Sequence, residues 1–130
     1  YVVSHSIPRV RFEGFKKNPT KNYEEASILL LTSDMEGFGL VIVEGMTYGC
    51  VPVVYGSYEA VYDIIEDGKS GYITSMPYNS KEMEDKVNVL MQDEQKRKQM
   101  AANAIDQSKK FSLGYVAQMW YNLFEDVLKY

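Results

Sequence analysis

Two glutamates and two glycines lie close together in one short segment of this chain. Glu36 and Glu44 are separated by seven residues, and Gly37 and Gly39 follow closely after the first of them. A carboxylate accepts two hydrogen bonds, which suits neighbouring hydroxyl groups of a sugar. Glycine has no side chain, so a ligand can approach its backbone closely. The spacing therefore fits a diphosphate over residues 37–40 with a transferred sugar on one side and a ribose on the other.

The neighbouring elements place this segment where phosphates bind. An apolar run over residues 28–32 predicts a strand buried on both faces, and residues 40–48 predict a helix. Ligands of open α/β sheets bind beyond the carboxyl ends of the strands, and the free N–H groups at a helix start favour phosphate. The segment has neither three glycines in the dinucleotide spacing GxGxxG nor a Walker lysine. Two alternatives remain open: Glu36 only complements the helix dipole, and Glu44 is only solvated.

Short apolar runs alternate with helical patterns over the first two thirds of the chain. We expect strands over residues 10–15, 28–32, 51–55 and 71–74, and helices over residues 22–26, 40–48 and 58–66. Such alternation predicts an α/β fold with a Rossmann-like parallel sheet flanked by helices.

The last third of the chain is predicted to be a helical tail. Asn79 and Glu82 have the spacing of a capping box, a second helix covers about residues 94–108, and Ser112 caps a third. The third helix has a wide apolar face made by Val116, Met119, Trp120, Leu123, Phe124 and Val127. This face either packs on the sheet or meets a partner, and in the second case the isolated domain is expected to self-associate.

Composition narrows the class of protein. The 130 residues fit one domain, and 45% apolar with 25% charged residues is typical of a globular one. With Cys50 and His5 as the only cysteine and histidine, a Cys/His metal cluster is excluded and a Ser-His-Asp triad is not expected. A net charge of −4 argues against binding to nucleic acid. Residues 1–22 carry five basic residues against Glu13 alone, which is either a solvated face or a positive rim near an anionic ligand.

At the two glutamates the sequence resembles the retaining glycosyltransferases of the GT-B fold, in the large group 1 family. The hallmark of that family is S-x-x-E-G-F-G-L-x-x-x-E-A-M-A-x-G, and residues 33–49 stand as SDMEGFGLVIVEGMTYG. The similarity extends through Pro52 and residues 66–68 and covers nearly the whole chain. Departures are Gly45 and Thr47, where alanine is usual, and one residue inserted before Pro52.

The resemblance implies a role for each residue of the segment. Glu36 would contact the transferred sugar and act as the catalytic residue, and Glu44 would hold the ribose hydroxyls. The N–H groups that would hold the sugar and phosphate belong to Gly37, Phe38, Gly39 and Leu40. Phe15 and Lys16 would touch the base. No metal or other cofactor is expected, because backbone and basic side chains neutralise the leaving diphosphate in this family.

The resemblance also implies a larger protein. Residues 1–130 would be the nucleotide-sugar (donor) binding domain, and the N-terminal acceptor domain, with an upstream Arg/Lys pair for the diphosphate, would be absent from this chain. Arg9 and Arg11 do not match that pair. The full-length enzyme would move a sugar from a nucleotide diphosphate sugar to a saccharide or lipid, as in polysaccharide biosynthesis. We expect it in the cytoplasm, with any contact to the inner face of the membrane made by the missing half. The alternative is a non-catalytic Rossmann-like module that binds a nucleotide or regulates, for example a flavodoxin-like one.

Overall fold

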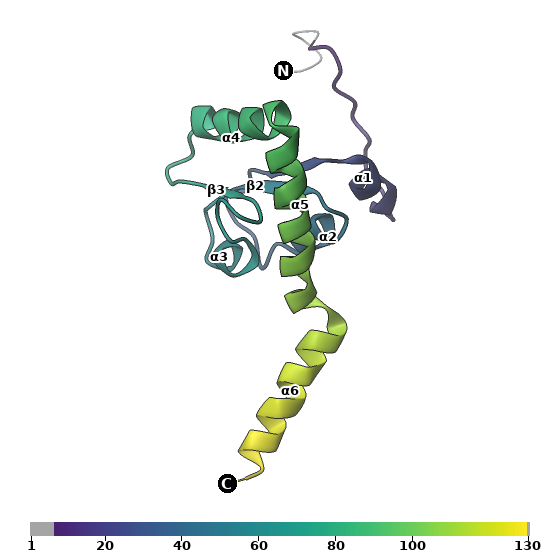
Figure 1. The fold of residues 1–130 in the computed structure, drawn as a ribbon, viewed down its shortest axis with the longest axis vertical. Helices are drawn as coiled ribbons and strands as arrows, with labels where there is room; N and C mark the ends of the chain where they lie inside the picture. Colours follow the sequence, from purple (N-terminus) through teal and green to yellow (C-terminus); the bar gives the residue numbers. More distant parts are fainter. Residues whose placement is uncertain (1–6, 130) are drawn as a thin grey trace.

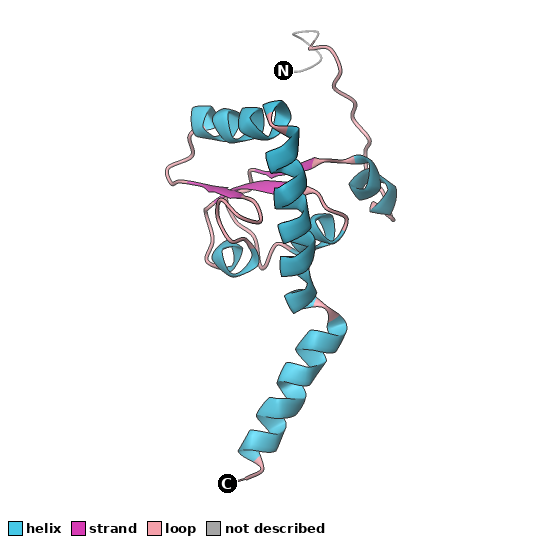
Figure 2. Ribbon diagram, viewed as in Figure 1, coloured by secondary structure: helices cyan, strands magenta, loops and turns pink. Residues whose placement is uncertain are grey.

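The computed structural model describes residues 7–129, so His5 lies outside the described part of the chain. It has an α/β fold in which a three-stranded parallel sheet, in the order β1-β2-β3, is flanked by helices (Figures 1 and 2). The strands are β1 (Ile28–Leu31), β2 (Val51–Tyr55) and β3 (Tyr72–Thr74). The helices are α1 (Thr20–Glu25), α2 (Leu40–Thr47), α3 (Ala60–Ile64), α4 (Ser80–Gln92), α5 (Glu94–Ser108), the 3-10 turn η1 (Lys109–Phe111) and α6 (Leu113–Val127). The predicted fold class is confirmed.

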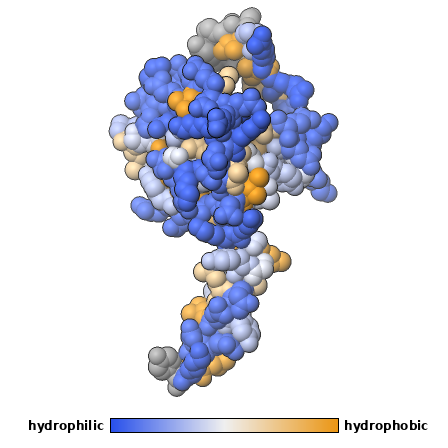
Figure 3. Space-filling view, viewed as in Figure 1, coloured by the Kyte–Doolittle hydropathy of each residue, from blue (hydrophilic) through white to orange (hydrophobic). Residues whose placement is uncertain are grey.

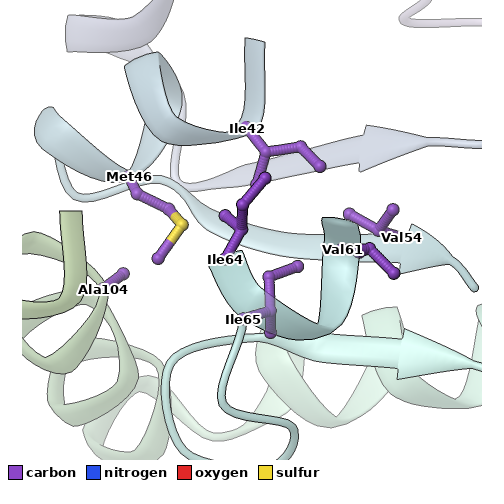
Figure 4. Close-up of a cluster of buried hydrophobic side chains, with 7 residues drawn as sticks. All are labelled: Ile42, Met46, Val54, Val61, Ile64, Ile65 and Ala104. Atoms are coloured by element: carbon purple, nitrogen blue, oxygen red, sulfur yellow. The ribbon is translucent and has the colours of Figure 1, made fainter. Parts of the chain in front are cut away.

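The core lies on both faces of β2, whose five residues are all buried. Side chains of a strand alternate between the two faces of the sheet, so Val54 points one way and Val53 and Tyr55 the other. Val54 joins a buried cluster with α2, α3 and Ala104 of α5 (Figure 4). Val53 and Tyr55 join a second cluster with α4 and Met100 of α5. The continuous apolar run of β2 therefore reflects burial on both faces.

Two strand predictions need correction. Residues 10–15 form no strand and instead run as an exposed segment toward α1 (Figure 1). Alternating polarity stabilises a strand only where a neighbouring strand can pair with it, and this segment has none within the described residues. β1, one of the two edge strands, was expected to be buried on both faces, but its Leu30 is 53% exposed.

The helices differ from prediction mainly at their ends. α3 covers residues 60–64 instead of 58–66. The Asn79 side chain caps α4 as predicted, accepting from the N–H groups of Lys81 at 2.9 Å and Glu82 at 3.3 Å. The Glu82 carboxylate does not return to Asn79, since it accepts from the Ser75 N–H at 3.0 Å. Only half of the predicted capping box forms.

The last helix, α6, projects away from the sheet and its covering helices (Figure 1). It begins where predicted, with the Ser112 hydroxyl accepting from the Tyr115 N–H at 3.3 Å. None of its residues is buried, and Trp120 and Phe124 are 53% and 58% exposed. Apolar side chains lie along its surface (Figure 3). The interpretation that this face packs on the sheet is therefore wrong.

Within residues 7–129, no helix combines the length and apolar character needed to cross a bilayer.

Candidate functional site

Two loops meet at the carboxyl edge of the parallel sheet. Residues 32–39 follow β1 and residues 56–59 follow β2, and parallel strands end at the same edge. The Ser57 hydroxyl donates a hydrogen bond to the Ser33 carbonyl oxygen at 2.8 Å, which joins the two loops. The predicted segment thus lies where ligands of open α/β sheets bind.

Gly39 sets the geometry of the start of α2. As the N-cap it has φ 90° and ψ 42°, in the left-handed region that favours glycine. A Cβ at this position would lie 2.5 Å from the Tyr58 hydroxyl and 3.2 Å from Cδ1 of Ile42, so the surrounding side chains leave no room for one. No side chain caps this helix start. The first N–H groups of α2 are therefore available to an anionic ligand.

Gly37 differs from Gly39 in having open space where a side chain would lie. A Cβ at Gly37 would meet no atom within 4 Å, and its φ lies outside the left-handed region. The packing of the described chain therefore does not require glycine here. The open space in front of Gly37 would let a ligand reach the backbone.

Glu36 lies beside this open space, close to a buried hydroxyl. Its side chain is half-buried, and its negative charge adds to the burial that raises the pKa of Tyr58. The Tyr58 hydroxyl is buried and has no hydrogen-bond partner within the described residues. Tyr58 follows β2, and the sequence does not predict its place in the site because no local pattern indicates that it lies against Gly39.

Phe38 turns its side chain away from the loop. Its ring packs edge-on against Phe111, with centroids 5.7 Å apart and an interplanar angle of 63°. The two rings and α6 line an apolar groove of about 550 Å³, whose other residues are Lys110, Val116, Met119, Trp120 and Leu123. Phe38 can therefore serve a ligand at the start of α2 only through its backbone.

Glu44 lies on the second turn of α2 and meets a tyrosine from α1. The Tyr23 hydroxyl donates to Oε2 of Glu44 at 2.9 Å, and the Tyr23 ring stacks on that of Tyr48. These three residues and their neighbours Asn18, Pro19, Thr20 and Thr47 line a pocket of about 310 Å³. Neither tyrosine was predicted from the sequence to belong to the site. Tyr48 follows Glu44 by four residues, so helical spacing gives a signal for it, whereas Tyr23 is 21 residues away.

The residues predicted to touch a base lie in the segment before α1. The Phe15 side chain is 94% exposed, and Lys16 pairs with Glu13 at 2.9 Å. The hydrogen bond from Lys16, with the positive charges of Arg11 and Lys16, lowers the pKa of Glu13. Part of the basic character of this segment is thus neutralised within it. Contact with a base stays a prediction.

Within residues 7–129, no three His, Cys, Asp or Glu residues are grouped so that they could hold a metal ion.

Glu36 lies just before the uncapped start of α2, and Glu44 lies one turn into that helix. Residues 5–107 match the model of the glycosyl transferases group 1 family, and the chain belongs to that family.

Curated relatives are longer than this chain. The poly(glycerol-phosphate) alpha-glucosyltransferase of Bacillus subtilis is 28% identical over 85% of this chain and 16% of its own length. A Campylobacter jejuni alpha-1,4-N-acetyl-D-galactosaminyltransferase that acts on an undecaprenol-linked saccharide is 26% identical over 92% of this chain and 33% of its own. The chain thus spans no more than about a third of the curated relatives it matches.

Solved structures share the fold. Anabaena HepE, in complex with UDP and glucose, superposes with a TM-score of 0.83 at 26% identity, covering 96% of this chain and 34% of HepE. The C-terminal domain of a group 1 family glycosyl transferase, LpcC of Francisella tularensis, has a TM-score of 0.72 at 26% identity, covering 86% of this chain and 59% of that domain. The fold is that of one half of a GT-B glycosyltransferase, as predicted from the motif.

Proposed function

We propose that this chain binds the donor of a glycosyltransferase and holds a nucleotide diphosphate sugar at the start of α2. The observation that carries the proposal is the uncapped helix start between Glu36 and Glu44, with open space in front of Gly37. In a member of the group 1 family, this arrangement supports sugar transfer by the whole protein.

The nucleotide of the donor is proposed to be UDP. HepE, at 26% identity, has been solved with UDP and with UDP-glucose, and a variant of TarM at 26% identity has been solved with UDP. UDP would place its diphosphate against the N–H groups of residues 37–40 and its ribose at Glu44. The base would then extend toward α1 and the segment that contains Phe15 and Lys16.

Glu36 is proposed to contact the transferred sugar and to act in the reaction. The sugar acquires positive charge as its bond to the diphosphate breaks, and a half-buried carboxylate beside it stabilises that charge more in the transition state than in the ground state. The departing diphosphate gains negative charge, which the N–H groups at the start of α2 stabilise. These groups supply the electrostatic contribution of this chain without a metal ion.

The acceptor is proposed to bind on an N-terminal domain of the same protein, which would also cover the apolar face of α6. Val116, Trp120 and Phe124 of that face are exposed here, and a second domain would remove them from water. The acceptor would be a saccharide or lipid-linked saccharide, since the name of the Campylobacter relative gives such an acceptor.

Transfer is proposed to retain the configuration of the sugar, so that the product keeps the α linkage that UDP-glucose carries. Two relatives named as alpha-transferases support that expectation.

Steady-state kinetics of the full-length protein test the assignment. Glu36→Gln should lower kcat by about 100-fold, because its interaction strengthens in the transition state. Glu44→Gln should mainly raise the donor KM, by about tenfold, because ribose is bound equally in both states. Equal changes confined to KM in both variants would contradict the role of Glu36.

A ligand comparison separates this function from a nucleotide-binding module. UDP and UDP-glucose should raise the melting temperature of the full-length protein, and FMN should leave it unchanged. Stabilisation by FMN alone would contradict a donor site. The anomeric configuration of the product, measured by NMR, decides whether transfer retains it.

A further inference from the structure

Glu44 uses only one of its carboxylate oxygens within the described chain. Oε2 accepts the hydrogen bond from the Tyr23 hydroxyl at 2.9 Å, and Oε1 has no hydrogen-bond partner among residues 7–129. A carboxylate has acceptor sites on both oxygens. The bond to Tyr23 therefore fixes the plane of the carboxylate and leaves one oxygen for a ligand.

Tyr23 is itself held in place by three contacts. Its ring stacks on Tyr48, with centroids 5.9 Å apart and an interplanar angle of 21°. Its carbonyl oxygen accepts from the Cys50 thiol at 3.3 Å, and its N–H donates to the Pro19 carbonyl oxygen at 3.2 Å. Tyr48 and Cys50 lie at the end of α2 and just beyond it. Tyr23 of α1 is thus held against α2, the helix that carries Glu44.

The Tyr23 hydroxyl is a hydrogen-bond donor at neutral pH. Burial first, then the hydrogen bond to Glu44 and its negative charge, raise the pKa of Tyr23 to about 12. The phenol therefore stays protonated. A donor of constant state and fixed position is what a carboxylate needs if it is to be oriented before its ligand arrives.

We propose that Tyr23 is a positioning residue of the donor site, which holds one oxygen of Glu44 so that the other receives the ribose hydroxyls. This inference rests on the proposed function, in which Glu44 binds ribose. It gives α1 a role that its sequence does not suggest, since α1 has six residues and none of them is buried. The alternative is that the same bond only anchors α1 to α2.

The test uses calorimetric titration of the full-length protein with UDP and with 2′,3′-dideoxy-UDP. Tyr23→Phe keeps the ring against Tyr48 and removes only the hydroxyl. The substitution should weaken the binding of UDP about fivefold. It should change the binding of the dideoxy nucleotide by less than about twofold, because that ligand has no ribose hydroxyl for Glu44. The donor KM should rise about fivefold while kcat stays within about twofold.

A matched control lies on α6, where the Tyr121 hydroxyl donates to Oε1 of Glu125, also at 2.9 Å. Tyr121→Phe removes the same kind of hydrogen bond far from Glu44 and should leave the binding of both nucleotides unchanged. Equal weakening of both nucleotides by Tyr23→Phe, or no weakening of UDP, would overturn the positioning role and leave the proposed function standing. A wild-type protein that binds both nucleotides equally would contradict the ribose role of Glu44 itself, and with it this proposal.

Discussion

The start of α2 and the helix α6 differ in how much of their surroundings this chain supplies. At the start of α2, Gly39 lies against Tyr58, Ser57 bonds to Ser33, and the side chains beneath belong to a closed core. Along α6, every side chain is exposed, including Trp120 and Phe124. The first region is packed against a core that this chain supplies, and the second is a surface whose apolar side chains are exposed.

This difference between the two regions predicts that the chain alone binds the nucleotide but does not transfer the sugar. A preformed helix start needs no other domain to present its N–H groups, so the chain by itself should hold a nucleotide. Transfer needs a donor and an acceptor aligned within about 3 Å, and an apolar helix face indicates where a second domain would dock.

The largest effect is expected in transfer by the 130-residue chain alone. Compared with the full-length protein, it should form product at least about a thousandfold more slowly, because the acceptor is proposed to bind on a second domain. Mass spectrometry after incubation with UDP-glucose and simple saccharide acceptors measures this. Multiple-turnover transfer by these residues alone would show that a second domain is not needed.

Replacing each of the two glycines by alanine should affect a different property, stability for Gly39 and UDP binding for Gly37. Gly39→Ala should destabilise the chain by about 2 kcal/mol, from left-handed backbone strain and displacement of Tyr58. Gly37→Ala should change the free energy of unfolding by less than about 0.5 kcal/mol, since its Cβ would meet nothing, and yet weaken UDP. Urea unfolding and UDP titration of both variants measure this. A stable Gly39→Ala, or Gly37→Ala with unchanged UDP affinity, would contradict the geometry described for the loop.

The smallest effect concerns the face of α6. The isolated chain should self-associate through it, and Trp120→Gln with Phe124→Gln should shift the chain toward monomer. Stability should change by less than about 0.5 kcal/mol, because neither side chain is buried. Sedimentation velocity measures the shift, with Gln118→Ala and Asn122→Ala as a control pair at the same spacing on the same helix. Association that persists in the first pair, or falls equally in both, would place the contact elsewhere.

The sequence predicts the central elements best. β2 and the start of α2 were placed to the residue, because an apolar run and a glycine-led helix start are local signals. Residues 10–15 were misassigned because strand formation depends on a partner that local alternation cannot report. The contacts of Tyr23 with Glu44 and of Tyr58 with Gly39 join residues about 20 apart, so no periodic pattern announces them. The apolar face of α6 was found by its period, but a period does not say what covers it.

The central claim is that the start of α2 binds a nucleoside diphosphate, and amide NMR of the 130-residue chain during titration with UDP tests it most directly. We predict shifts concentrated at the N–H groups of residues 36–44 and at Tyr23. The dissociation constant should be near one millimolar, about −4 kcal/mol, because the family resemblance implies that a basic pair outside these 130 residues also binds the diphosphate. Shifts concentrated on α4 and α5, or none up to about 10 mM UDP, would contradict the claim.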